Sequence, residues 1–427
     1  MIEALDRTIL LCRDYVADSV SNEEIVRALQ RRVLCVADEE TARSHSGQTA
    51  IFTLAALLAR MGMQVSVDAP EASLVAAQPP FIGKTLHSAV NSGSGQIFPG
   101  VTIGLSDTQE PDLLFIIGTG KSRHKVPCWW LTGTDWSGAL VDSERAAKCW
   151  LTEWPIGAMT SALLGAGEAF KYAMRRLQLR HSEDRIFFEA SHACAWTFDP
   201  VQLSPSPLDL GRVDIVSAGA ITQATLYVLL RLPNVLMNGR IFDDDHTAVS
   251  NLNRNMLTLV RDLGPKVDVV ARCAAPNILL TPIPRRFTAT HAPLGNRVLV
   301  GVDDIPSRWT VQRHSPGWVG VSGTSHFSIS SSAHRPGDPC SACLHPVDDA
   351  LPAGPIPTIA YVSLWAGISL AVRLVREALR QPYPTDRQHL WLTPLRMDQP
   401  HAAIWSPVPP HPICPAQCAA SRQLTLD

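Results

Sequence analysis

Residues 242–254, FDDDHTAVSNLNR, decide which fold the second half of this 427-residue chain adopts. Ahead of them, RVDIVSAG (212–219) is typical of a strand and AITQATLYVLLRL (220–232) of a helix, and NGRIFDDD (238–245) is typical of a second strand that ends in acids. A strand, a helix and a strand in this order predict a parallel α/β sheet. In such a sheet the acids emerge at the carboxyl edge, where ligands bind.

The residues at that edge are suited to a nucleotide. Gly219 opens the strand-to-helix turn, where the free N–H groups of a helix N-terminus can hold a phosphate. Ser217 and Thr222 occupy the other two glycine positions of the usual phosphate turn, so the turn alone is a weak indication. Asp243 and Asp245 follow about 20 residues later, where a carboxylate can accept hydrogen bonds from ribose hydroxyls.

Polar residues farther along could hold phosphates and a metal ion. Asn251 and Arg254 lie on one face if their segment is helical, and Lys266 adds a point charge. RVLVGVDD (297–304) is typical of a later strand, and Asp303 at its end could bind the Mg²⁺ that bridges phosphates. Each residue has a structural alternative, such as a turn cap or a solvated face. Their meeting at one edge favours a nucleotide site.

The run FDDDHTAVSNLNR, with LGPK (263–266) and VLVGVDDIPSR (298–308), resembles the adenylation domain of ubiquitin-activating enzymes and of the molybdopterin and thiamine sulfur-carrier adenylyltransferases. The resemblance covers most of 208–418. It implies attack by a protein's C-terminal carboxylate on the α-phosphorus of ATP, with pyrophosphate leaving and no general base required. It also implies that Asp243 binds the ATP ribose, that Asn251, Arg254 and Lys266 hold phosphates, and that Asp303 serves Mg²⁺.

The first half of the chain repeats the same order of elements. RRVLCVAD (31–38), QTAIFTLAALLARMG (48–62) and MQVSVDAP (63–70) form a predicted βαβ unit, offset from the second-half unit by roughly 180 residues. We therefore predict two Rossmann-like, doubly wound parallel sheets in tandem, a pseudodimer. The expected domains are 1–200 and 201–427.

Two segments are expected to connect or cover these domains. The Pro- and Ser-rich stretch at 199–211 is the predicted boundary. SHFSISSSAHRPGDP (325–339) is a polar stretch that predicts a mobile linker.

The first half is expected to bind no ATP. ADEETARSHSGQ (37–48) stands where the phosphate turn should be, with no glycine beside the strand end and with acids that repel phosphate. Ubiquitin-activating enzymes pair an inactive with an active copy of this fold, so the resemblance implies an inactive first half. It also implies that an arginine from the N-terminus of one copy enters the ATP site of the other. LDRTILL (5–11) makes Arg7 the candidate, with an ordinary helix-surface arginine as the alternative.

Four cysteines predict a structural zinc site. CSAC (340–343) and CPAQC (414–418) supply two pairs of thiols at spacings close to those of zinc ribbons. Because four thiolates complete a tetrahedron, no ligand position stays open for catalysis. The predicted ligands are Cys340, Cys343, Cys414 and Cys418.

Many ubiquitin-activating enzymes form a thioester on a cysteine just before the final helix, but GPIPTIA (354–360) has Pro357 at that place. Cys273 or Cys194 could be brought in by a loop, Thr358 or Ser363 could accept the acyl group as an oxyester, or the adenylate could pass directly to a partner. The other single cysteines are predicted to be buried structural residues: Cys12, Cys35, Cys128 and Cys149.

Composition limits the classes of partner. Hydrophobic residues make up 46% and charged residues 18% of the chain, and the net charge of −2 provides no basic face for nucleic acid or an anionic membrane. No apolar run approaches the roughly 20 residues of a membrane span. The N-terminus carries acids among its apolar residues, unlike a signal peptide, so we expect a cytoplasmic protein.

These patterns together predict an activating enzyme for a ubiquitin-like protein. Its expected partners are a β-grasp protein with a C-terminal glycine and a conjugating enzyme, in a bacterial pathway, with homodimerisation as a further alternative. Its expected cofactors are ATP, Mg²⁺ and Zn²⁺. Two rival functions stay open: adenylation of a sulfur carrier or peptide without a covalent enzyme intermediate, and a non-catalytic scaffold for a ubiquitin-like conjugation system.

Overall fold

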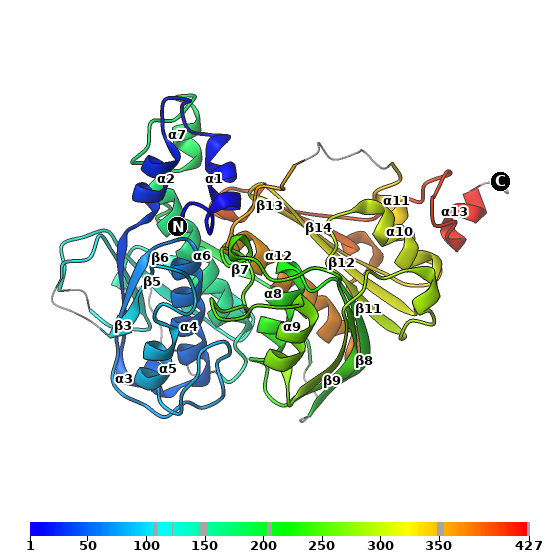
Figure 1. The fold of residues 1–427 in the computed structure, drawn as a ribbon, viewed down its shortest axis with the longest axis horizontal. Coiled ribbons are helices and arrows are strands. Elements are labelled where there is room, and N and C mark those ends of the chain that lie inside the picture. The colour runs from blue at the N-terminus through cyan, green and yellow to red at the C-terminus, as the bar shows by residue number, and fades with distance from the viewer. Residues whose placement is uncertain are drawn as a thin grey trace.

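The computed structural model describes residues 1–105, 109–121, 123–144, 150, 152–202, 207–347 and 354–424, and contains two α/β sheets that follow each other along the chain (Figure 1). The first sheet has seven strands in the order β3-β2-β1-β4-β5-β6-β7. Its strands are β1 (Arg32–Ala37), β2 (Gln64–Asp68), β3 (Ile103–Leu105), β4 (Leu113–Ile117), β5 (Cys128–Gly133), β6 (Ser137–Val141) and β7 (Ala193–Thr197). Its helices are α1 (Asp6–Arg13), α2 (Asn22–Leu29), α3 (Glu39–Arg43), α4 (His45–Arg60), α5 (Leu86–Gly93), α6 (Ile156–Met174) and α7 (Asp184–Phe187).

The second sheet has eight strands in the order β10-β9-β8-β11-β12-β13-β14-β15. Its strands are β8 (Leu208–Val216), β9 (Val235–Phe242), β10 (Ile278–Ile283), β11 (Arg297–Val300), β12 (Trp318–Ser325), β13 (Ser328–His334), β14 (His389–Leu392) and β15 (Ala403–Ser406). Its helices are α8 (Ala220–Leu229), α9 (Lys266–Ala274), α10 (Ile305–Arg313), α11 (Ser341–Leu344), α12 (Ala360–Ala378) and α13 (Ala419–Leu424).

The two sheets share one strand order over seven strands, and the parallel part of this order agrees with the predicted pair of α/β sheets in tandem. The order β3-β2-β1-β4-β5 in the first sheet corresponds to β10-β9-β8-β11-β12 in the second, and all of these strands are parallel. The sheets are nevertheless mixed, because β6 and β7 in the first sheet and β13, β14 and β15 in the second are antiparallel. The expectation of wholly parallel sheets is therefore wrong at one edge of each.

The prediction of a mobile linker at 325–339 is also wrong. Strand β13 occupies the middle of this stretch and is hydrogen-bonded between β12 and β14. Only two residues connect β12 to β13, and so short a turn can join only antiparallel strands. Ser331 and His334 of this strand are fully buried, and Ser331 accepts a hydrogen bond from Arg373. The linker was predicted because the stretch is polar, but several of these polar residues are buried in a strand of the sheet.

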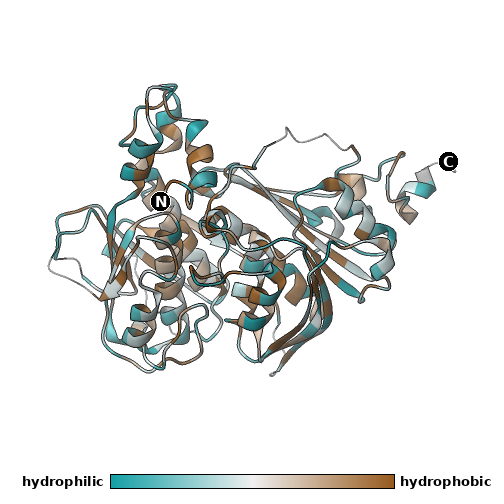
Figure 2. Ribbon diagram, viewed as in Figure 1, coloured by the Kyte–Doolittle hydropathy of each residue, from teal (hydrophilic) through white to brown (hydrophobic). Residues whose placement is uncertain are grey.

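Helices from both halves meet between the sheets. Helices α4 and α6 of the first half pack against α12 of the second, and all 16 residues of α4 are buried. The hydroxyl of Tyr227 on α8 donates to Thr53 on α4 across this interface (3.1 Å). Figure 2 shows apolar residues, in brown, concentrated in these central helices and in the strands. None of the helices in the described ranges combines the length and apolarity of a membrane span.

Candidate active site

A cavity of about 820 Å³ opens at the carboxyl edge of the second sheet. The turns after β8, β9 and β11 lie along its walls, as the Rossmann-like topology requires. Helix α1 of the first half reaches the same cavity. Every residue predicted for the nucleotide site lines it: Gly219, Asp243, Asp245, Asn251, Arg254, Lys266, Asp303 and Arg7.

The turn between β8 and α8 contains only one of the three glycines usual in a phosphate turn, yet it includes a residue in the left-handed conformation typical of such glycines. Ser217 adopts the left-handed conformation (φ 89°) that glycine normally occupies, and Gly219 is the N-cap of α8. The N–H of Gly219 donates to Ser217 Oγ (3.1 Å), and the N–H of Ala218 donates to Asp243 Oδ2 (2.7 Å). Two N–H groups of the turn therefore already have acceptors within the protein.

The acids after β9 are tied to each other and to Lys266. Asp243 Oδ1 accepts the N–H of Asp245 (2.8 Å). Lys266, the first residue of α9, forms an ion pair with Asp245 (Nζ to Oδ2, 2.5 Å), and its backbone N–H donates to the Asp245 carbonyl (3.0 Å). The Lys266 ammonium is thus held at the cavity wall by a carboxylate, where it could exchange this partner for a phosphate.

Two arginines from opposite halves face the same cavity. Arg254 donates to the Asn253 side chain (2.8 Å), and Arg7 donates to the Ile356 carbonyl (3.2 Å). Burial lowers the pKa of the Arg254 guanidinium to about 10, and the nearby Arg7 charge acts in the same direction. The Arg254 guanidinium therefore stays charged at neutral pH. Neighbouring like charges in one cavity favour the binding of a polyanion.

The segment after β11 adds Asp303 and a buried arginine. Asp303 is exposed at the cavity, whereas Asp304 is the N-cap of α10 and accepts the N–H of Ser307 (2.9 Å). Arg308 is buried and donates to the Val302 carbonyl (2.9 Å), and burial lowers its pKa. A carboxylate at a strand end, beside several cationic side chains in one cavity, could contribute a ligand to Mg²⁺.

Sequence reasoning missed two of the cations that line this cavity. Arg286, which contacts Asp304 (3.1 Å), follows β10, a strand that we did not expect. Arg308 is the last residue of the run VLVGVDDIPSR (298–308), and no role was predicted for it. Arg313, at the end of α10, does not line the cavity and donates to the Pro415 carbonyl (3.1 Å). Recognising β10 would have placed Arg286 at the carboxyl edge of the sheet.

Pro357 also lines the cavity, whereas no cysteine among the described residues does. Thr358 and Ser363 do line it, with hydroxyl oxygens 3.4 Å apart and both side chains buried. Cys273 instead lies against the Leu257 carbonyl (3.6 Å), and burial raises its pKa.

The remaining single cysteines also lie away from the cavity or outside the described residues. Cys194 is on β7, and burial raises the pKa of its thiol to about 12. Burial has the same effect on Cys12, Cys35 and Cys128, as expected for structural cysteines. Cys149 lies outside the described residues.

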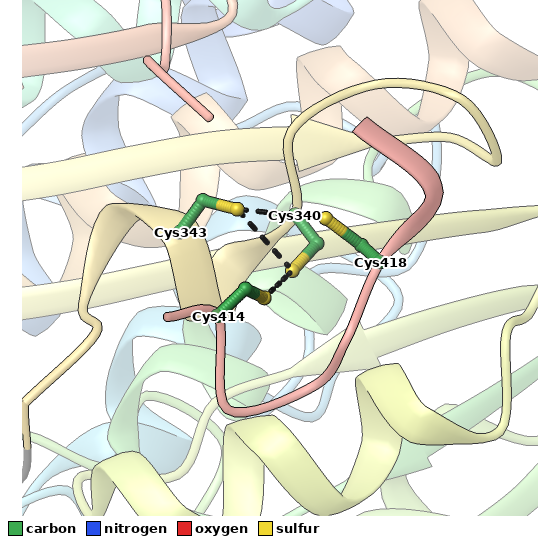
Figure 3. Close-up of side chains that lie close together, drawn as sticks. All are labelled: Cys340, Cys343, Cys414 and Cys418. Carbon is green, nitrogen blue, oxygen red and sulfur yellow. Dashed lines mark hydrogen bonds between the residues drawn. The ribbon is translucent and has the colours of Figure 1, made fainter. Parts of the chain in front are cut away.

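The four paired cysteines form one cluster at the C-terminal end of the chain (Figure 3). The sulfur of Cys340 lies 3.5 Å from that of Cys414, and the sulfur of Cys343 lies 3.5 Å from that of Cys418. Sulfur atoms in a zinc tetrahedron lie about 3.8 Å apart, given a Zn–S bond of about 2.3 Å. Val408 and parts of α10 and α11 surround the sulfurs. The donor set and spacing fit a structural Zn²⁺, which would tie the C-terminal segment to α11.

Loss of this cluster is expected to lower stability. Cys414→Ser should reduce zinc content from roughly one equivalent per chain to near zero and lower the melting temperature by several degrees. Metal analysis and thermal denaturation measure both effects. Cys273→Ser is the matched control and should change neither. Full zinc content in the Cys414 variant would contradict a zinc site at these thiols.

The comparisons with known proteins place a family match on the first half of the chain. Residues 32–185, which include β1 to β6, match the family model of the BilD N-terminal domain. The uncharacterized protein y4jF of Sinorhizobium fredii is 26% identical over 336 residues, which are 74% of this chain and 61% of that protein. This chain therefore spans less than two thirds of that relative's length.

Solved structures with similar folds include MccB of E. coli, which aligns over 49% of this chain and 64% of its own with a TM-score of 0.40 and 15% identity. The structure of MccB with AMPCPP and selenomethionine MccA aligns over 43% and 60%, with a TM-score of 0.37 and 16% identity. PaaA aligns over 46% and 64%, with a TM-score of 0.35 and 13% identity. The family match thus falls on the first sheet, whereas the cavity lies on the second.

Proposed function

We propose that the cavity binds ATP with Mg²⁺ and that the protein adenylates the C-terminal carboxylate of a ubiquitin-like protein. The observation that carries this proposal is the meeting of three cationic side chains, Arg7, Arg254 and Lys266, with the carboxylates of Asp243 and Asp303 around one cavity. A triphosphate needs such cations, and a ribose and a metal ion need such carboxylates.

In this proposal each residue acts through its charge and position. Asp243 accepts hydrogen bonds from the ribose, and Asn251, Arg254 and Lys266 hold phosphate oxygens. Asp303 would hold Mg²⁺, which would neutralise charge on the phosphates and on the leaving pyrophosphate. A carboxylate oxygen of the partner attacks the α-phosphorus, and the bond from that phosphorus to the pyrophosphate oxygen breaks. The products are an acyl adenylate and pyrophosphate, and no proton has to be removed from the nucleophile.

The first half is proposed to contribute Arg7 and to bind no nucleotide. At the end of β1, where a phosphate turn would lie, Asp38 accepts the N–H groups of Thr41 (2.7 Å) and Thr119 (2.9 Å). Burial raises the pKa of Asp38, but these hydrogen bonds outweigh burial and hold the pKa below its usual value. A charged carboxylate therefore occupies the anion-binding position of the first sheet.

The surface beside the cavity supports a protein partner. Gly323, Ser330, Trp391 and Ile404 are directly opposite one another on β12, β13, β14 and β15, so the side chains of the last three share one face of the sheet. The first three line the cavity, and Trp391 (39% exposed) and Ile404 (51% exposed) continue the row outward. Two neighbouring exposed apolar side chains that lead from the cavity to the outer strand suit a folded domain whose extended tail enters the cavity.

The adenylate is proposed to pass directly to the thiol of a conjugating enzyme. The described cysteines lie away from the cavity, which supports transfer without a thioester on this chain. The buried Thr358 and Ser363 are the acceptors for the rival oxyester route.

One experiment tests the substrate class and the fate of the adenylate. Labelled pyrophosphate should exchange into ATP when a β-grasp protein ending in glycine is added, and not when that glycine is removed. No adduct on this chain should be released by dithiothreitol. A thiol-labile adduct would contradict direct transfer, and exchange with a sulfur carrier or short peptide alone would favour the rival substrate class. ATP binding without pyrophosphate exchange under any of these conditions would favour the third function, a non-catalytic scaffold.

A further inference from the structure

Arg60, the last residue of α4, crosses from the first half to the segment that follows β9. Its side chain is fully buried. Nη1 donates to the Leu252 carbonyl (2.7 Å), and Nη2 donates to the carbonyls of Met256 (3.0 Å) and Thr258 (2.9 Å). One guanidinium therefore holds three carbonyls of one short segment, 252–258, here called the nucleotide loop.

Because burying the Arg60 charge is costly, the guanidinium restricts the conformation of the nucleotide loop around it. Burial lowers the pKa of Arg60 to about 9, so it remains charged at neutral pH. Among the described residues no carboxylate forms an ion pair with Arg60, and its hydrogen bonds go to carbonyl oxygens, while the charge of Asp262 helps at longer range. Because a buried charge is tolerated only with well-directed partners, the loop can hold few other conformations around this side chain.

The nucleotide loop carries residues of the cavity. Arg254 and Asn255, which both line the cavity, lie between Leu252 and Met256, two of the carbonyls that Arg60 holds. A second contact from the first half joins Asn253 Nδ2 to Thr8 Oγ1 (3.1 Å). The direction of Arg254 thus depends on a segment that the first half fixes on both sides.

We propose that Arg60 is a positioning residue, through which the first half sets the conformation of the nucleotide loop and so aims Arg254 at the nucleotide. The inference rests on the proposed function and deepens it. The first half then acts on the site in two ways, directly through Arg7 and indirectly through Arg60.

Arg231 provides a matched control in the same interface. It follows α8, is 1% exposed and donates to the Pro79 carbonyl of the first half (2.8 Å) and to the Tyr227 carbonyl (3.0 Å). Its guanidinium therefore joins the two halves as Arg60 does, but it holds no carbonyl of the nucleotide loop. Damage to the interface in general should appear in Arg231 variants too.

A double-mutant cycle tests the inference by pyrophosphate exchange. Arg60→Lys keeps the charge but lacks the planar fork that reaches three carbonyls. We expect kcat to fall about 10-fold to 100-fold, with a smaller change in KM for ATP. In an Arg254→Ala background the same change should cost less than about 2-fold, because its effect passes through Arg254. Arg231→Lys should retain exchange within about 3-fold.

Hydrogen exchange gives a readout that needs no activity. Amides of the nucleotide loop should exchange faster in Arg60→Lys and at the unchanged rate in Arg231→Lys. Equal losses in the Arg60 and Arg231 variants, full additivity with Arg254→Ala, or an unchanged loop would each overturn the inference. Wild-type protein without any exchange activity would instead overturn the proposed function, and the inference with it.

Discussion

Asp303→Ala is expected to reduce pyrophosphate exchange by at least about 10³-fold, because the variant loses the carboxylate proposed to hold Mg²⁺ against the phosphates. Asp303 is exposed at the carboxyl edge of the second sheet, and it is the neighbouring Asp304 that caps α10. The change should therefore leave the melting temperature nearly constant. Initial rates of exchange at saturating partner and varied Mg²⁺ measure the effect, which excess Mg²⁺ should restore only in part.

Asp68→Ala is the control for this variant. Asp68 is an exposed acid at the carboxyl end of β2 in the first sheet, away from the cavity. Its loss should leave the rate unchanged. An Asp303 variant with more than about one tenth of wild-type exchange would exclude an essential metal ligand at this position.

Arg7→Ala is expected to reduce kcat for exchange by about 10² to 10³-fold. Its guanidinium enters the cavity from α1, where it lies close enough to Arg254 to lower that residue's pKa. In the proposed reaction, negative charge accumulates on phosphate oxygens as pyrophosphate leaves, so a fixed cation stabilises the transition state more than the bound substrate. The reduction should therefore appear mainly in kcat and less in KM for ATP.

Arg13→Ala on the same helix distinguishes this role from a general effect of α1. Arg13 donates to the side chain of Asn22 (3.0 Å) and does not line the cavity. Its variant should keep exchange near the wild-type rate even if stability falls. Unchanged exchange in Arg7→Ala would refute an arginine supplied by the first half.

The sequence carried enough information to bring most of the candidate site together. Asp243, Asn251 and Asp303 follow strands of a parallel sheet, and the carboxyl ends of such strands meet at one edge whatever the details of packing. Each cysteine pair could be recognised because the spacing of zinc ligands is local, and two pairs supply the four ligands of one tetrahedral site. The predicted role of Arg7 came from the family resemblance, because local sequence does not indicate which residues a helix-surface arginine will contact.

Other features depend on long-range packing, which residue patterns do not display. Strand β13 resembled a linker because Ser331 and His334 satisfy their polar groups inside the core. Arg60 lay in a predicted helix with nothing to distinguish it from a solvated arginine. Its role depends on contacts in the folded structure, where it donates to carbonyls 192 to 198 positions away in the chain.

In the proposed function nucleotide binds at the second sheet, in the cavity that Asp243 and Asp303 line, and the first sheet binds none. Titration calorimetry with Mg·ATP measures this directly. We expect one nucleotide bound per chain, binding lost in Asp243→Ala and binding unchanged in Asp68→Ala. No binding by the wild-type chain, or binding that survives Asp243→Ala unchanged, would contradict it.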